Sequence, residues 1–175
     1  MFVPLKNYLI VDGYNIIYAW NDLRELSNVS LESARVKLID KLSNYQGFTD
    51  EVVIVVFDGY KVSGSKGTLE THNKVFVVYT KEAETADNYI ERAVTKLPKE
   101  YYIRVATNDA LEQTIILGKG ATRITANELS EMIQVEEKKI RRNYTEKRPV
   151  KNNPLIDNVN KETLEWLEMM RRKRK

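Results

Sequence analysis

Hydrophobic and polar positions along the chain fall into two alternating kinds of segment. Short runs of mostly apolar residues, typical of parallel strands covered on both faces, lie at 8–11, 51–59, 74–80, 101–107 and 122–125. Between them apolar residues recur at the helical spacing, which predicts helices at 16–26, 31–45, 85–97, 110–117 and from about 127 onward. Strands that alternate with helices predict an α/β fold, with a mainly parallel sheet of five strands and right-handed crossovers.

The boundaries of two helices carry recognisable capping residues. Ser30 is a predicted N-cap for the helix at 31–45. Thr125 and Glu128 have the spacing of a capping box, which places the start of the next helix between them. The sequence therefore defines where these helices begin as well as their apolar faces.

The last part of the chain is predicted to be a helical extension. Pro149 and Pro154 interrupt the preceding helix, and Asn160 is a candidate cap for a last helix. Leu164, Trp166 and Leu167 of that helix are expected to pack back on the body. We therefore divide the chain into a main domain at 1–146 and a basic C-terminal extension at 147–175.

Residues 59–72 form a glycine-rich segment between the second and third predicted strands. It lacks the spacing of a P-loop and of a dinucleotide-binding turn. Lys61 and Lys66 give it cations that can contact phosphates. An ordinary hairpin-like connection between the two strands explains the segment equally well and is the interpretation we favour.

Composition narrows the possible chemistry. Of the 175 residues, 42% are apolar and 30% are charged, as in globular proteins. No stretch approaches the roughly 20 apolar residues of a membrane span, and the first residues lack a signal-peptide layout, so a cytoplasmic protein is expected. Cysteine is absent and His72 is the one histidine. This excludes thiolate and multi-histidine metal sites and favours Mg²⁺ or Mn²⁺ held by oxygen ligands.

Charge is distributed unevenly along the chain. Residues 1–135 carry 15 basic and 18 acidic side chains, whereas residues 136–175 carry 13 basic and 7 acidic ones. An acidic body with a basic tail is consistent with a cation site in the first part and a polyanion contact in the second. A solvated helix with a frayed end explains the tail as well, and the sequence does not separate the two.

Acidic side chains follow four of the predicted strands. The carboxyl ends of parallel strands lie along one edge of a sheet, where ligands bind. The aspartates expected at this edge are Asp12, Asp58, Asp87 and Asp109, with Glu82 and Glu84 nearby and Glu91 one turn after Asp87. Each can be explained separately as a helix cap or a turn residue. Together they repel one another unless a cation intervenes, which favours a metal site.

A metal ion among carboxylates is suited to the hydrolysis of phosphodiester bonds. A phosphatase of the haloacid-dehalogenase type also transfers phosphoryl groups, but it needs an Asp-x-Asp pair. Here Tyr14 stands two residues after Asp12. Nuclease chemistry is therefore the better match to the residues.

The segments "LIVDGYNII", "VVFDG", "TADNYIE" and "VATND" resemble the motifs of the NYN branch of the PIN-like nucleases, with the closest resemblance to YacP-type proteins over about residues 6–170. The resemblance implies a three-layer fold with a mainly parallel five-stranded sheet between helices. It also implies a metal-dependent endoribonuclease. A characterised member of this branch enters the ribosomal A site and cuts messenger RNA during translation.

The resemblance assigns roles residue by residue. Asp12, Asp87 and Asp109 match catalytic and metal-binding aspartates, Asn15 matches a catalytic amide, and Asp58 matches a further aspartate whose role is less defined. Thr107 supplies a hydroxyl where related proteins often have serine. For Asn15 a helix N-cap is the structural alternative. RNA, in particular mRNA, and the ribosome are the expected partners.

Basic side chains are the expected contacts to RNA phosphates. They are Lys61, Lys66, Lys138, Lys139, Arg141, Arg142, Arg171 and Arg172. A non-catalytic module that binds RNA or the ribosome is the alternative function, although such a module gains nothing from an acidic site. The sequence does not define the target message, the number of metal ions, the oligomeric state or the need for the ribosome.

Overall fold

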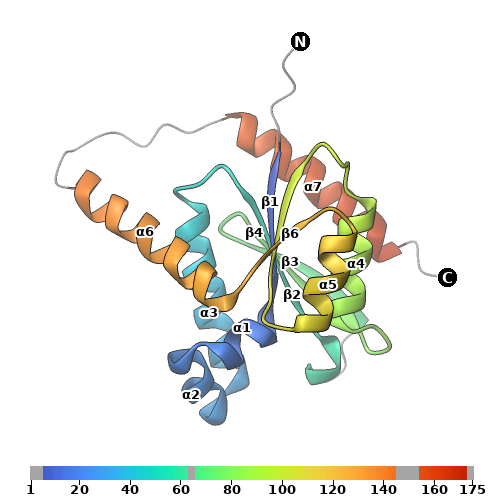
Figure 1. Cartoon of the computed structure of the whole chain (residues 1–175), viewed down its shortest axis with the longest axis horizontal. Helices are drawn as coiled ribbons and strands as arrows, with labels where there is room; N and C mark the ends of the chain where they lie inside the picture. Colours follow the sequence, from blue (N-terminus) through green and yellow to red (C-terminus); the bar gives the residue numbers. More distant parts are fainter. Residues whose placement is uncertain (1–5, 63–65, 145–153, 173–175) are drawn as a thin grey trace.

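The computed structural model describes residues 6–62, 66–144 and 154–172, with the backbone alone for 154–158. A sheet lies between helices on both of its faces (Figure 1). The elements are β1 (Asn7–Asp12), α1 (Gly13–Ala19), α2 (Asn21–Val29), α3 (Leu31–Gln46), β2 (Val52–Phe57), the 3-10 helix η1 (Gly59–Lys61), β3 (Lys66–His72), β4 (Val75–Lys81), α4 (Ala86–Lys96), β5 (Tyr102–Ala106), α5 (Ala110–Gly118), β6 (Thr122–Ile124), α6 (Ala126–Tyr144) and α7 (Pro154–Arg172).

The sheet has the strand order β3-β4-β2-β1-β5-β6. β4, β2, β1, β5 and β6 pair in parallel and correspond to the five predicted strands, which confirms the α/β class. Because these strands run the same way, their carboxyl ends share the edge at the bottom of Figure 1, beside α1 and α2.

A sixth strand, β3, was not predicted. It lies within the segment that we interpreted as a connection, and it pairs antiparallel with β4 at the edge of the sheet. The hairpin turns at Asn73 and Lys74, which both have positive φ angles of 45° and 72°, as two-residue hairpin turns require. Most β3 side chains are exposed, so the strand lacks the apolar pattern that identified the others. The predicted five-stranded sheet is thus extended by one polar edge strand.

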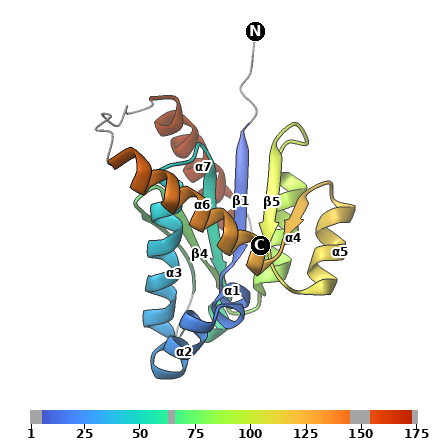
Figure 2. The ribbon, with the colours of Figure 1, turned by 60° about the vertical axis from the view of Figure 1, so that its left-hand side comes forward.

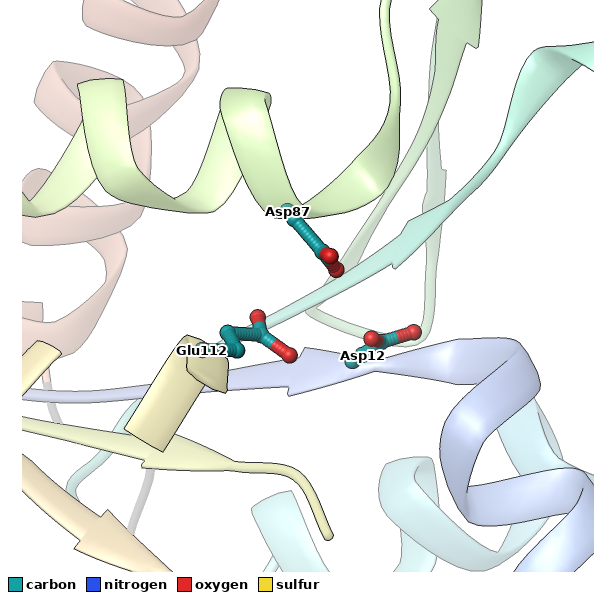
Figure 3. A group of neighbouring side chains, drawn as sticks. All are labelled: Asp12, Asp87 and Glu112. Carbon is teal, nitrogen blue, oxygen red and sulfur yellow. The ribbon is translucent and has the colours of Figure 1, made fainter. Parts of the chain in front are cut away.

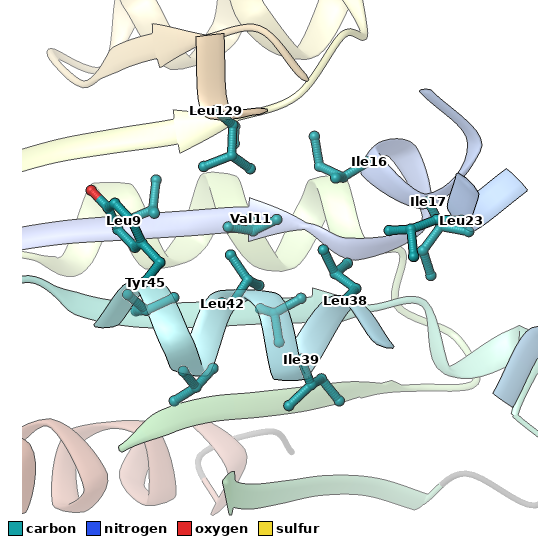
Figure 4. Close-up of a cluster of buried hydrophobic side chains, with 14 of the residues drawn as sticks. Leu9, Val11, Ile16, Ile17, Leu23, Leu38, Ile39, Leu42, Tyr45 and Leu129 are labelled. Atoms are coloured by element: carbon teal, nitrogen blue, oxygen red, sulfur yellow. The ribbon is translucent and has the colours of Figure 1, made fainter. Parts of the chain in front are cut away.

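Apolar side chains of the sheet alternate between two hydrophobic clusters, one on each face. Leu9 and Val11 of β1 point to the face covered by α1, α3 and α6, while Tyr8 and Ile10 point to the face covered by α4 and α7. Figure 4 shows Leu9 and Val11 between side chains of α3 and Leu129 of α6. Figure 2 shows α3 and α6 on the opposite side of the sheet from α4 and α5. Burial on both faces holds β1 rigidly in the middle of the sheet.

The single helix predicted at 16–26 is two helices, α1 and α2, that meet at Trp20. Trp20 has an extended backbone, with φ −91° and ψ 124°. Its indole Nε1 donates a hydrogen bond to the carbonyl oxygen of Ala126, at 2.9 Å. The contact ties this corner of the chain to the start of α6. Apolar periodicity did not reveal the break because both helices place apolar residues toward the same cluster.

The predicted C-terminal helix packs on the sheet but begins earlier than expected. α7 starts at Pro154, which is favoured in the first position of a helix, so Asn160 lies inside it and does not cap it. Leu167 and Met170 are buried in the cluster on the α4 face, and Trp166 packs against them. Leu164 is 38% exposed. The predicted domain boundary at 146 lies outside the described residues.

Within the described part of the chain, no helix has the length and apolar character needed to cross a membrane.

Candidate metal centre

Three carboxylates from three separate segments meet at the carboxyl edge of the sheet. Asp12 ends β1, Asp87 lies in the first turn of α4 and Glu112 lies in the first turn of α5. One oxygen from each lies within 4.8 Å of the others. Figure 3 shows the three side chains pointing toward one another across the end of β1. The predicted convergence of Asp12 and Asp87 is present in the structure.

Glu112 was not predicted as a site residue. It is 4% exposed, and in the described part of the chain neither of its carboxylate oxygens has a hydrogen-bond partner. A buried carboxylate without partners costs several kcal/mol when charged, as an order of magnitude, unless a proton or cation joins it. Its position is therefore consistent with a ligand for a cation.

The electrostatics of the group favour an added positive charge. Burial, together with the charge of Asp12, raises the pKa of Glu112 to about 8. Burial and the charge of Asp87, opposed by the N–H of Asn15, together raise the pKa of Asp12 to about 6. Partial burial and the charge of Asp109 raise the pKa of Asp87. Among the described residues, no lysine or arginine forms an ion pair with any of these three carboxylates.

Asp58 and Asp109 lie at the margin of the group and act as caps. An Oδ1 of Asp58 accepts the N–H of Tyr60 at 3.0 Å, at the start of η1. An Oδ1 of Asp109 accepts the N–H groups of Leu111 and Glu112, at 2.9 and 3.1 Å. The charges of both aspartates also raise the pKa of Asp87, so both contribute to the field of the site. Each of the two aspartates thus caps a helix and also lies close enough to the site to affect its charge.

Asn15 connects the site to the segment that follows β5. Its backbone N–H donates to Oδ1 of Asp12 at 3.3 Å, so Asp12, and not Asn15, is the N-cap of α1. The side-chain oxygen of Asn15 accepts the N–H of Asn108 at 2.7 Å. Asn108 in turn accepts the N–H of Ala126 at 2.8 Å. Thr107, which is fully buried, accepts the N–H of Asp109 through its hydroxyl.

The neighbouring glutamates are directed elsewhere. Glu84 is buried and forms an ion pair with Arg92 at 3.0 Å, and Glu91 pairs with Lys119 at 3.7 Å. Glu82 is exposed. None of the three belongs to the carboxylate group that the described residues form.

The predicted RNA-binding residues divide into separate surfaces. Lys66 begins β3 opposite Lys81, whose ammonium donates to the carbonyl oxygen of Arg171 at 3.2 Å. Arg171 and Arg172 pair with Glu168 on their own helix. The basic residues of α6 begin three turns along that helix, about 20 Å from its start at Ala126; they are Lys138, Lys139, Arg141 and Arg142. Lys61 lies in η1, directly after the Asp58 cap.

The mainly parallel sheet, covered on both faces and carrying acidic residues at its strand ends, defines an α/β domain of the NYN type, which is a nuclease-like class.

A model of the YacP-like NYN domain matches residues 9–172, and the chain therefore belongs to this family. It is 41% identical to YacP of Bacillus subtilis (strain 168) over 162 residues, which cover 90% of this chain and 95% of that protein. The crystal structure of Rae1 (YacP) from Bacillus subtilis is similar, with a TM-score of 0.69, 37% identity and 95% of each chain covered. Its W164L mutant gives a TM-score of 0.68 and 42% identity, over 78% of this chain and 80% of that one. The resemblance seen in the sequence motifs is confirmed.

Proposed function

We propose that this protein is a divalent-metal-dependent endoribonuclease that hydrolyses phosphodiester bonds in RNA. The observation that carries the proposal is the convergence of Asp12, Asp87 and Glu112 at the strand ends, where the carboxylate oxygens of the buried Glu112 have no hydrogen-bond partner among the described residues. Membership of a nuclease-type, RNA-related family supports the same class of reaction.

The donor set fits Mg²⁺ or Mn²⁺, because all the side chains that converge are carboxylates. Bound there, such an ion activates a water molecule and polarises a phosphoryl oxygen. Asp12 and Glu112 are the buried ligands in our proposal, and Asp87 is the exposed ligand that faces the substrate. Asp109 and Asp58 add negative charge that strengthens cation binding, and the caps that they form fix their positions.

Asn15 has a positioning role in this proposal. Its two hydrogen bonds, to Asp12 and to Asn108, hold the end of β1 against the segment that carries Asp109 and Glu112. The distance between carboxylates of β1 and α5 is then set by these two hydrogen bonds, which do not depend on the ion. Rigid support of this kind is what a metal site needs for its affinity.

The proposed substrate is messenger RNA on the translating ribosome, in the cytoplasm. The resemblance of the sequence motifs to a branch with a member that cuts messenger RNA in the ribosomal A site supports this choice. The basic surfaces on η1, β3, α6 and α7 support it as well. Contacts to phosphates carry little sequence information, so a ribosome that presents the message at a fixed place can supply the selectivity.

The proposal is tested by cleavage of RNA, both free and on translating ribosomes, with Mg²⁺ or Mn²⁺ and with a chelator. Asp87→Asn and Glu112→Gln should each lower the cleavage rate by at least about 100-fold, because each removes a ligand charge. The matched control is Asp40→Asn, which removes a charge from an exposed position of α3. Undiminished cleavage by both variants, or in chelator, contradicts the metal mechanism. RNA binding without cleavage in any condition favours the binding-module alternative.

A further inference from the structure

Lys61 is held against two aromatic rings beside the acidic site. Its ammonium lies 4.8 Å from the ring centre of Tyr14 and 4.7 Å from that of Tyr18. It also donates a hydrogen bond to the hydroxyl of Tyr18 at 3.1 Å. The two rings stack at 6.4 Å, and Tyr14 packs against Phe57 of the buried core. The side chain of Lys61 is thus fixed in place, whereas most exposed lysines are free to rotate.

The position of this lysine follows from the two elements that carry the contact. Tyr14 and Tyr18 lie on α1, which Asp12 caps, and Lys61 lies on η1, which Asp58 caps. Both elements leave the carboxyl edge of the sheet from neighbouring strands, β1 and β2. The fixed cation therefore lies at the rim of the carboxylate group.

In the described part of the chain, no carboxylate neutralises the charge of Lys61, and its side chain contacts the two tyrosines. Cation–π contacts orient an ammonium but leave it able to attract an anion. The acidic group repels a phosphodiester that approaches it, and a cation at the rim offsets this repulsion by attracting the phosphate.

An exposed aromatic ring adjoins the same lysine. Tyr60, the preceding residue of η1, is 79% exposed, and its backbone N–H is anchored on Asp58. Tyr18 is 42% exposed, and Lys61 lies over its ring. Proteins that hold single-stranded nucleic acid combine such cations with aromatic rings on which bases stack.

We propose that Lys61 and Tyr60 form a clamp for single-stranded RNA at the rim of the acidic site, with Lys61 binding a phosphate and Tyr60 stacking on an unpaired base. Tyr18 serves as the positioning residue for Lys61. The clamp rests on the proposed function in that RNA is the substrate. The clamp further specifies that this RNA is single-stranded, because the bases of a duplex are already stacked and do not present a free face to Tyr60.

The test is the binding of a short fluorescein-labelled oligouridine, followed by fluorescence anisotropy, with the Asp87→Asn change present in every protein to prevent cleavage. Tyr60→Ala should weaken binding by about 5- to 100-fold, the range for loss of one stacked base. Tyr60→Phe should bind normally because it keeps the ring. Lys61→Gln should weaken binding and lower the slope of log affinity against log salt by about 0.7.

Two changes at the opposite edge of the sheet serve as matched controls. Tyr102→Ala removes a tyrosine that is 48% exposed at the start of β5, and Lys99→Gln removes an exposed lysine near it. Both should bind the oligouridine as the parent does. A blunt RNA duplex should bind equally to the parent and to Tyr60→Ala.

The clamp is overturned if the parent does not bind oligouridine, if Tyr60→Ala binds it as tightly as the parent, or if the duplex suffers the same loss. A different result contradicts the proposed function. It is contradicted if RNA is bound in the expected way but the protein without the Asp87→Asn change does not cleave it in the presence of metal.

Discussion

Glu112 and Glu128 occupy equivalent places in their helices but have opposite surroundings. Each lies three residues after an N-cap, Asp109 for Glu112 and Thr125 for Glu128. The carboxylate of Glu128 accepts the N–H of Thr125 at 2.6 Å, and this capping box lowers its pKa. The carboxylate of Glu112 makes no such hydrogen bond to the backbone of its N-cap, and it points into the acidic group. The same spacing thus yields a cap in one helix and a candidate ligand in the other.

The raised pKa values at the site predict how stability depends on pH. From about pH 4 upward, the folded protein without metal retains protons that the unfolded chain has released, on Asp12 up to about pH 6 and on Glu112 up to about pH 8. Its free energy of unfolding should therefore fall as the pH rises through this window, by on the order of a few kcal/mol. Denaturant unfolding in chelator at a series of pH values measures the effect. Glu112→Gln should flatten the profile, and an unchanged profile contradicts the prediction.

Metal should reverse the loss of stability at the upper end of that window. An ion that binds only the folded protein adds about 2.7 kcal/mol when its concentration is 100 times its dissociation constant. Melting temperatures at pH 8 should therefore rise with Mg²⁺ or Mn²⁺ in the parent and respond less in Glu112→Gln. If the parent melts at the same temperature with and without either ion, the carboxylate group does not bind metal.

The sequence revealed the aspartates of the site more readily than the glutamate. Asp12 follows an apolar run directly, and parallel strands must place such residues at one edge. Asp87 follows a strand by a few residues and opens a helix. Glu112 has no such marker: it lies in the first turn of α5, three residues after Asp109, where a capping box is the ordinary interpretation. Its burial depends on how α5 packs against α4 and β6, which periodicity does not define.

At the scale of elements, Gly13 shows how tightly the start of α1 packs on β2. A Cβ at this position meets the Phe57 ring at 2.3 and 2.5 Å. That ring is fully buried and lies between Tyr14 and Tyr79. The glycine is therefore required by the close approach of two elements, and it directly follows Asp12.

Gly13→Ala should destabilise the protein by about 1–3 kcal/mol, the usual range for overpacking a core. It should also weaken metal binding, because the added methyl displaces the start of α1 and the cap at Asp12 with it. The matched control is Gly118→Ala at the end of α5, where nothing lies within 4 Å of the added Cβ. Denaturant unfolding and metal titration of both variants measure the difference. Equal stability of the two variants contradicts this account of Gly13.

The elements that the sequence predicted are those with an apolar face on the core. The five parallel strands and the helices at α3, α4, α5 and α6 all have such a face. The edge strand β3 lacks it, since pairing with one neighbour defines that strand. The break at Trp20 depends on one indole hydrogen bond to a residue far along the chain. Contacts of this kind leave no periodic signal.

At the scale of the whole molecule, the predicted RNA-binding cations other than Lys61 form two groups at different distances from the acidic site. The edge group contains Lys66, Arg171 and Arg172, near the end of β4. The helix group lies on α6, about 20 Å from the start of that helix, and contains Lys138, Lys139, Arg141 and Arg142. Only an extended RNA or a larger particle can contact both groups and the site together.

Replacement of each group by glutamine should therefore have different effects. The edge-group variant should bind short and long RNA more weakly, whereas the helix-group variant should lose affinity only for long RNA and for ribosomes. Each lost phosphate contact should lower the salt slope by about 0.7 for single strands. Anisotropy and ribosome co-sedimentation across a salt series measure both, with metal binding as the unaffected control. If both variants bind ribosomes normally, these cations do not contact the ribosome and are exposed only to solvent.

The central position of β1 affects how the protein is made. Its neighbours in the sheet are β2 and β5, and β5 begins at Tyr102. A chain that emerges from its N-terminus therefore exposes one apolar edge of β1 until more than half of the residues have been synthesised, and such edges are prone to aggregate. The acidic site is completed later still, by Glu112. A truncated nascent chain thus contains Asp12 without its partners, and the site arises only in the nearly finished domain.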